Sequence, residues 1–275
     1  MEILNTVSPT GREQIKIKGT QTDKFGNFIK GQGKTLFVCA LDEPGVMVTT
    51  LTEKICIVTV GNQKPEELVN KKITFTNNAT AIVRCEKKEE IKDTDLTLEL
   101  ISGELNTGEF GSISPEAQES ETEIIANNLS YKIGAYVLKD VEKGKVLFAR
   151  EHNFGFKGLR AHLSENEYER VILISTTERD KIGILAKDKS AVADVNLRDT
   201  MKILAKEIGI SVDVEISEEN LGLSIPQITG NGAISGGILI PVKNKGKMYE
   251  SCNCKMIENA KRLLLKIAEK YDNID

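Results

Sequence analysis

Two adjacent acids follow the most strand-like run in the first half of the chain. Residues 36–40, L-F-V-C-A, are continuously apolar, which is typical of a strand covered on both faces of a mainly parallel sheet. Asp42 and Glu43 follow this run and Leu41, at the carboxyl end of the expected strand. Ligands of open α/β sheets bind at that edge, so acids there suggest a functional role. The alternative is a solvated turn, because Asp-Glu-Pro-Gly is a favourable turn sequence.

Other reactive residue types are scarce. The chain has two histidines, His152 and His162, which excludes metal chemistry that needs several imidazoles. Five cysteines without framework spacing fit reduced thiols in a cytosolic protein, and the pair Cys252 and Cys254 lacks the further ligands of a zinc site. No G-x-S-x-G motif occurs, and neither histidine lies in a recognisable pairing. The sequence therefore gives no support for serine or cysteine nucleophile chemistry.

Length and composition describe an ordinary globular protein. A chain of 275 residues suggests one large or two ordinary domains. The net charge of -4 and a pI near 5.6 give no basic face for phosphate binding, which argues against a nucleic-acid partner. No apolar run approaches the roughly 20 residues of a membrane helix, and the first seven residues do not resemble a secretory signal. We therefore expect a cytoplasmic protein with no membrane partner.

Strands and helices alternate after residue 148. Apolar runs at 170–176, 190–195, 212–216 and 236–242 indicate strands, and spacing at 154–165, 197–208 and 256–271 indicates helices. The second of these helices would place one apolar face inward, formed by Leu197, Met201, Leu204 and Ala205. Such alternation predicts an α/β fold with a doubly wound, mainly parallel sheet and helices on both faces.

The middle of the chain has a different pattern. Short segments alternate between apolar and polar residues, with turn residues between them, at 55–60, 72–75, 81–83, 96–100, 132–138 and 145–148. Period two with intervening turns is typical of an antiparallel barrel or sandwich. The prediction is therefore an α/β domain formed by residues 1–52 and 148–275, interrupted by a small all-β barrel domain at residues 53–147.

The motifs resemble those of one enzyme family. The run around Asp42 is similar to the A-H-x-D-E-x-G segment of the dinuclear metallo-aminopeptidases known as glutamyl aminopeptidases, tetrahedral aminopeptidases or cellulase M homologues. Ser8-Pro9-Thr10-Gly11 resembles the family's S-P-S-G, and residues 23–27, D-K-F-G-N, resemble its D-x-x-G-N. The resemblance implies a zinc-peptidase-like α/β fold with a β-barrel inserted at the same point.

The resemblance also implies five metal ligands and a carboxylate general base, which together let two cations clamp a water. The first ligand, a His, falls on Ala40, which has no lone pair, while the Asp that orients this His is retained as Asp42. The family's A-x-D-x-R-x-G motif aligns with residues 149–155. This alignment places Glu151 on the bridging Asp and Asn153 on the Arg.

The family's Glu-Glu pair supplies the base and then a ligand. Aligned on the Gly that follows the pair, Asp180 takes the base position and Lys181 the ligand position, whereas a shift of one residue puts Arg179 and Asp180 there. Either alignment places a cation where a carboxylate should bind metal. This is the strongest argument against a dinuclear centre.

Of the last two ligand positions, one is retained and one is lost. Asp194, in S-A-V-A-D-V, falls on the fourth ligand, an Asp, and the fifth, a His, has no counterpart after His162. We therefore expect no cofactor. The alternative is one divalent cation (Mg, Mn, Ca or Zn) held by carboxylate oxygens, with Glu151 and Asp194 as the candidate ligands. The structural interpretation is that these acids pair with Lys181 or Arg179.

The resemblance, together with the altered ligand positions, implies a homologue that has lost the metal site and peptide hydrolysis. Such a pseudoenzyme would act as a binding or assembly subunit, in a homo-oligomer or together with an active paralogue. One alternative is an active metallo-aminopeptidase with an unusual or mononuclear site. A second is a sensor that binds a peptide or small ligand in the old cleft, for which Lys181 or Arg179 would contact a carboxylate.

Overall fold

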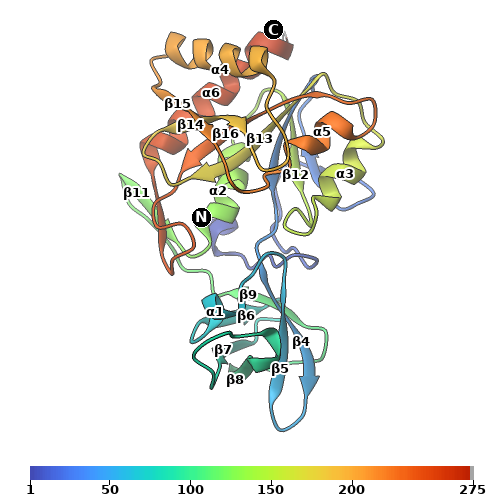
Figure 1. The fold of residues 1–275 in the computed structure, drawn as a ribbon, viewed down its shortest axis with the longest axis vertical. Coiled ribbons are helices and arrows are strands. Elements are labelled where there is room, and N and C mark those ends of the chain that lie inside the picture. The colour runs from blue at the N-terminus through green and yellow to red at the C-terminus, as the bar shows by residue number, and fades with distance from the viewer. Residues whose placement is uncertain (273–275) are drawn as a thin grey trace.

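An eight-stranded mixed sheet forms the centre of the larger, upper part of the computed structural model, which describes residues 1–272 (Figure 1). Its strands lie in the order β1-β2-β12-β3-β13-β16-β14-β15. The pairs β12–β3, β3–β13, β13–β16 and β14–β15 are parallel, and the other pairs are antiparallel. The strands are β1 (Gln21–Thr22), β2 (Phe28–Lys30), β3 (Thr35–Ala40), β12 (Lys145–Ala149), β13 (Arg170–Thr177), β14 (Ile182–Lys187), β15 (Val212–Ile216) and β16 (Ile234–Pro241).

The strand β3 is buried on both faces, as its continuous apolar run predicts. Phe37 and Cys39 belong to the core on one side of the sheet, and Leu36 and Val38 belong to the core on the other side. All four side chains are at most 1% exposed. Parallel neighbours flank β3 on both edges, so its carboxyl end opens at the same edge of the sheet as those of β12 and β13.

Helices cover both faces of this sheet. The larger core contains buried residues of α2 (Leu129–Leu138), α4 (Val195–Glu207) and α6 (Cys254–Asp272), together with the short 3-10 helix η1 (Glu2–Asn5). The smaller core contains α3 (Lys157–Leu163) and α5 (Ser224–Ile228). The predicted inward faces of α4 and α6 are confirmed, since Leu197, Met201, Leu264 and Ile267 are all buried. None of the helices in residues 1–272 is long and apolar enough to cross a membrane.

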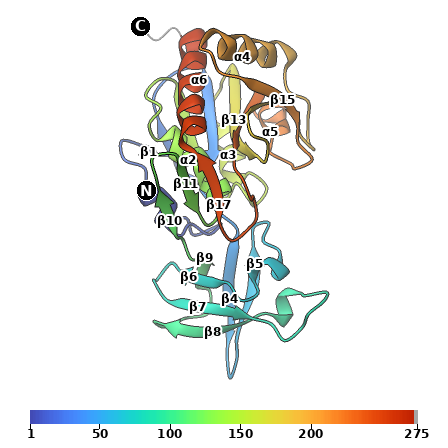
Figure 2. The same cartoon turned by 90° about the vertical axis from the view of Figure 1, so that its left-hand side faces the viewer.

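A closed six-stranded antiparallel barrel lies at one end of the molecule (Figure 2). Its strand order is β4-β5-β8-β7-β6-β9, and β9 pairs back with β4, so the barrel leaves no unpaired edge strand. The inserted all-β barrel is thus confirmed. Its elements are β4 (Gly45–Leu51), β5 (Ile55–Val60), α1 (Pro65–Leu68), β6 (Lys72–Phe75), β7 (Thr80–Arg84), η2 (Asp93–Asp95), β8 (Thr97–Ser102) and β9 (Phe110–Ile113).

The chain between the barrel and β12 belongs to the α/β part. Residues 132–138, predicted as a strand, form most of helix α2, because Leu129, Ile133 and Val137 recur at helical spacing and are fully buried. Residues 145–148 lie in β12 of the large sheet. A three-stranded antiparallel sheet completes this part, formed by β10 (Ala117–Glu119), β11 (Glu123–Ala126) and β17 (Glu250–Asn253). The barrel strands therefore span residues 45–113, against the predicted domain of 53–147.

Two other predicted elements differ. The strand predicted at residues 190–195 is a loop that ends at Asp194, the N-cap of α4, and Val195 is the first residue of that helix. The loop forms because the buried carboxylate of Asp188 accepts hydrogen bonds from the backbone of Ser190 and Ala191. The helix expected at 154–165 is shorter, and α3 begins only at Lys157.

Candidate functional site

A cavity of about 630 Å³ lies between the barrel and the carboxyl edge of the sheet. Ala40 at the end of β3 and Thr176 near the end of β13 line it, and His152 lines it from the segment after β12. Asn62 and Lys64 line it from the barrel side. Its volume falls within the range of small-ligand pockets, and it occupies the edge where α/β sheets bind ligands.

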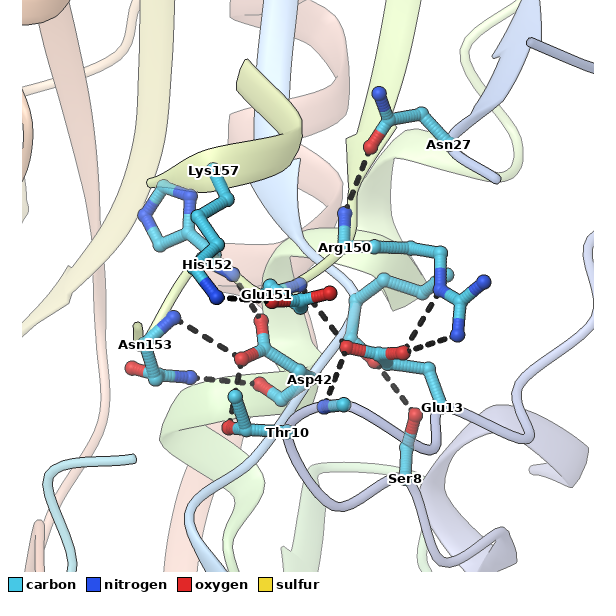
Figure 3. A network of polar contacts seen from close by, with 12 residues as sticks. Ser8, Thr10, Glu13, Asn27, Asp42, Arg150, Glu151, His152, Asn153 and Lys157 are labelled. Carbon is cyan, nitrogen blue, oxygen red and sulfur yellow. Dashed lines mark hydrogen bonds and ion pairs between the residues drawn. The ribbon is translucent and has the colours of Figure 1, made fainter. Parts of the chain in front are cut away.

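Asp42 lies beside this cavity and is fully engaged by donors (Figure 3). The Thr10 hydroxyl donates to Oδ2 (2.8 Å), and the backbone N–H groups of His152 and Asn153 donate to Oδ1 (2.9 Å) and Oδ2 (3.0 Å). The Asn153 side-chain amide also donates to the Asp42 carbonyl oxygen (2.9 Å). Burial raises the pKa of Asp42 to about 6, although these bonds oppose the shift. The carboxylate thus holds the turn between β12 and α3 in place.

Glu43 joins four segments of the chain. Its Oε1 accepts from the Ser8 N–H (2.9 Å) and the Ser112 hydroxyl (2.7 Å), and its Oε2 accepts from the Asn128 amide (2.8 Å). The Lys132 ammonium of α2 lies 3.1 Å from Oε2, and both charged side chains are at most 2% exposed. Because Ser112 lies on β9 and Lys132 on α2, the Glu43 carboxylate ties the barrel to the α/β part.

Glu151, the candidate bridging ligand, pairs with the protein's own cation. The Lys157 ammonium lies 2.9 Å from its Oε2 (Figure 3). Its backbone has φ of 46°, and its N–H donates to the Glu13 carboxylate (2.9 Å), which also accepts from Arg150 Nε (2.7 Å). The strained backbone at Glu151 is therefore held by neighbouring acids and bases.

His152 presents an uncharged imidazole to the cavity. Burial lowers its pKa to about 4, and its ring meets the Phe156 ring edge-on with centroids 4.6 Å apart. Its Nδ1 is buried without a hydrogen-bond partner among residues 1–272. A proton on that nitrogen would be an unsatisfied buried donor, so the favoured tautomer carries the proton on Nε2. The ring then offers one N–H donor to the cavity.

The three candidate residues in the connection between β13 and β14 belong to networks other than that of Asp42. Arg179 lies 3.5 Å from Oε2 of the buried Glu215, beside a smaller hollow of about 280 Å³. Lys181 pairs with Asp213 at the sheet edge (3.2 Å) and does not line the large cavity. Asp180 is exposed in the same short connection. The cations predicted to face a ligand thus pair with nearby acids of β15.

Asp194 has a local role. Its side chain accepts from the Leu197 N–H (2.8 Å) and caps α4, as an N-cap Asp does. The structure draws attention to Asp188 instead, which is fully buried. Burial alone would raise the pKa of Asp188, but donated hydrogen bonds hold it below its ordinary value. The donors are the Ser190 hydroxyl and the backbone N–H groups of Ser190, Ala191, Leu221 and Leu223.

These contacts do not fit a two-metal centre. No group of three or more His, Cys, Asp and Glu side chains within residues 1–272 is placed to hold a metal ion. Ala40 offers no donor atom, and the oxygens of Asp42 already accept bonds from protein donors. Glu151 and Asp194 belong to separate networks, one with Lys157 and one at the start of α4.

Sequence reasoning missed the charged residues that line the cavity. Lys189 and Glu218 both face it, although neither belongs to a motif and they lie far apart in the chain. Tyr131 also lines the cavity, from the start of α2 and next to the residues predicted as a strand. A local signal existed only for His152, which stands in the segment aligned with the family's bridging motif.

The chain is similar to known aminopeptidases in sequence and fold. No protein-family model matches it. A protein of Acetivibrio thermocellus named "Putative aminopeptidase" is 27% identical over 297 residues, which cover 92% of this chain and 89% of that protein.

Solved structures share the fold over nearly the whole chain. An aminopeptidase of the archaeon Desulfurococcus kamchatkensis has a TM-score of 0.86 at 14% identity, covering 98% of this chain and 93% of its own. The TET1 peptidase of Pyrococcus horikoshii has a TM-score of 0.77 at 17% identity, covering 90% and 88%. An endoglucanase structure from Thermotoga maritima has a TM-score of 0.77 at 17% identity, covering 98% and 96%. The chain therefore has an aminopeptidase-like fold.

Proposed function

We propose that the chain is a member of the tetrahedral aminopeptidase family that does not hydrolyse peptides by the two-metal mechanism. It acts as a binding or assembly subunit in the cytoplasm. The aminopeptidase-like fold, the relative from Acetivibrio thermocellus and the motifs around Asp42 support the family assignment.

The observation that carries the loss of hydrolysis is the state of the candidate ligands. Two-metal hydrolysis needs carboxylate and imidazole groups whose lone pairs are open to the cations. Here Ala40 stands at the first ligand position, and the oxygens of Asp42 accept three hydrogen bonds from Thr10, His152 and Asn153. Glu151 is neutralised by Lys157. A cation at this edge would have to displace these partners.

An assembly role draws on the structural relatives. The TET1 peptidase of Pyrococcus horikoshii is described as assembling into a tetrahedron or a large octahedral shell. By analogy, we propose that this chain forms an oligomer of its own copies, or joins an active paralogue. The buried ion pair between Glu43 and Lys132 would fix the barrel relative to the α/β part in such a subunit.

Metal content and activity test the first part of this proposal. Purified protein is incubated with zinc, cobalt, manganese or magnesium, freed of loose metal, and analysed for bound ions and for release of amino acids from aminoacyl p-nitroanilides. We expect well below one ion per chain and no hydrolysis. Two ions per chain with hydrolysis would overturn the proposal. One ion with hydrolysis would favour the alternative of an active mononuclear aminopeptidase.

Light scattering coupled to gel filtration tests the second part. We expect a particle several times heavier than the 30.3 kDa chain. A monomer that stays monomeric when mixed with a candidate paralogue would remove the assembly role. That outcome would leave the metal result unaffected.

A further inference from the structure

The cavity wall carries one cation and one anion that have no ionic partner among the described residues. Lys189 and Glu218 both line the cavity and are exposed. The other cations of the wall are paired, Lys245 with Glu219 (2.8 Å) and Lys64 with Glu67 (3.7 Å). Two opposite charges that face the same space without neutralising each other can bind a ligand that carries both signs.

The two charged residues lie on segments that run side by side. The Lys189 N–H donates to the carbonyl oxygen of Glu219 (3.1 Å), and the Ser217 N–H donates to that of Lys187 (2.9 Å). The buried Asp188 holds both segments, because its carboxylate accepts hydrogen bonds from the N–H of Ser190, next to Lys189, and from the N–H of Leu221, three residues after Glu218. The backbone positions of Lys189 and Glu218 are therefore fixed relative to each other, and binding requires little reordering of the loops.

The remaining wall is partly apolar. Phe156, Ile174 and Leu221 line the cavity and are each at most 9% exposed. The His152 ring adds an uncharged N–H donor next to Phe156. A ligand held between Lys189 and Glu218 would thus find apolar surface for a side chain and one further donor for an oxygen.

We propose that this cavity binds a free amino acid with an apolar side chain in its zwitterionic form. Its carboxylate pairs with Lys189, its ammonium pairs with Glu218, and its side chain packs against Phe156, Ile174 and Leu221. A free amino acid fits because its two charges lie close together, and Lys189 and Glu218 lie on neighbouring, hydrogen-bonded segments of the same wall. The inference rests on the proposed binding function and names its ligand.

Isothermal titration calorimetry with L-leucine tests the proposal, followed by the other apolar amino acids. L-Leucinamide lacks the carboxylate, N-acetyl-L-leucine lacks the ammonium, and the peptide Leu-Leu separates the two charges. We expect each of the three to bind at least about tenfold more weakly than the free amino acid, because a charge-assisted hydrogen bond is lost or strained. Equal binding of the amide, of the acetyl derivative or of Leu-Leu would overturn the proposal.

Matched variants locate the binding. Lys189→Met and Glu218→Gln should each weaken binding at least about tenfold, whereas Lys255→Met and Glu258→Gln, exposed on α6, should leave it unchanged. Thermal unfolding checks that all four variants fold. The proposal is wrong if every apolar amino acid has a dissociation constant above about 10 mM, which is weaker than the millimolar affinity of a modest pocket. It is also wrong if all four variants bind the amino acid equally well. Neither result changes the metal and hydrolysis data, so this inference can fail independently of the proposed function.

Discussion

At the scale of single residues, Asp42 and His152 are in contact but titrate in opposite senses. The backbone N–H of His152 donates to the Asp42 carboxylate, while burial raises the pKa of Asp42 from 3.8 to about 6 and lowers that of His152 from 6.5 to about 4. Both shifts have the same physical cause, since burial disfavours whichever form is charged. Each residue is therefore neutral over part of the pH range in which it would be charged in the unfolded chain.

The two shifts affect stability with opposite signs. Between about pH 4 and pH 6 the folded chain keeps a proton on Asp42 that the unfolded chain has lost, so this residue makes stability fall as pH rises. Over a similar window the unfolded chain binds a proton at His152 that the folded chain does not, so this residue makes stability rise with pH. The contributions largely cancel in the intact protein.

Replacing His152 should reveal the Asp42 contribution. The change His152→Phe keeps an aromatic ring against Phe156 and removes one titration. We expect the free energy of unfolding of the wild type, minus that of the variant, to grow by about 2–3 kcal/mol between about pH 4.5 and 7.5. Urea denaturation at several pH values measures this. Parallel pH profiles for the two proteins would show that His152 titrates normally in the folded state.

At the scale of elements, the start of α4 depends on Asp194. Its carboxylate satisfies the N–H of Leu197, one of the donors that a helix N-terminus leaves unpaired. The same residue is the one metal-ligand candidate that the sequence retains unchanged. Capping and metal binding predict different consequences of its removal.

The variant Asp194→Ala separates these roles. If Asp194 only caps α4, its replacement should lower the free energy of unfolding by about 1 kcal/mol and leave the amount of bound metal unchanged. The control Asp199→Ala, inside α4 and in surface ion pairs with Arg198 and Lys202, should cost at most about 0.5 kcal/mol. Denaturant unfolding and metal analysis of both variants are the measurements. A fall in metal content for Asp194→Ala alone would restore it as a ligand.

At the scale of the whole molecule, the barrel is held to the α/β part by a buried charge. Glu43 stands where the chain leaves the sheet for β4, and it receives Lys132 from α2 and Ser112 from β9. Both charged side chains are almost completely removed from water. Removal of one partner would leave the other charge buried and unpaired.

The variant Lys132→Met should therefore be costly. We expect a loss of about 3 kcal/mol in the free energy of unfolding, against at most about 1 kcal/mol for Lys64→Met, which breaks an exposed pair. Adding Glu43→Gln should cost less in the Lys132→Met background than in the wild type. Chemical denaturation of the four proteins completes the cycle. Strict additivity would mean that the two side chains do not interact in the folded protein.

The sequence by itself determined the features that depend on residues close together in the chain. The continuous apolar run of β3 predicted burial on both faces, the spacing of Leu197, Met201 and Leu204 predicted the inward face of α4, and period-two alternation predicted the barrel. Periodicity records which face of an element leaves water, and it is written within a few turns of chain. The loss of donor atoms at Ala40 was equally visible, because residue type alone decides it.

Only the tertiary structure decided which groups meet. Residues 132–138 are so apolar that both periods fit, and packing of Ile133 and Val137 into the core made them a helix. Lys181, a candidate ligand-binding residue, forms an ion pair with Asp213 because β14 and β15 lie side by side. Lys189 and Glu218 share a cavity wall because the backbone of their loops is hydrogen-bonded across nearly thirty residues of sequence. A side chain's charge is local, but its partner is set by how strands and loops are brought together.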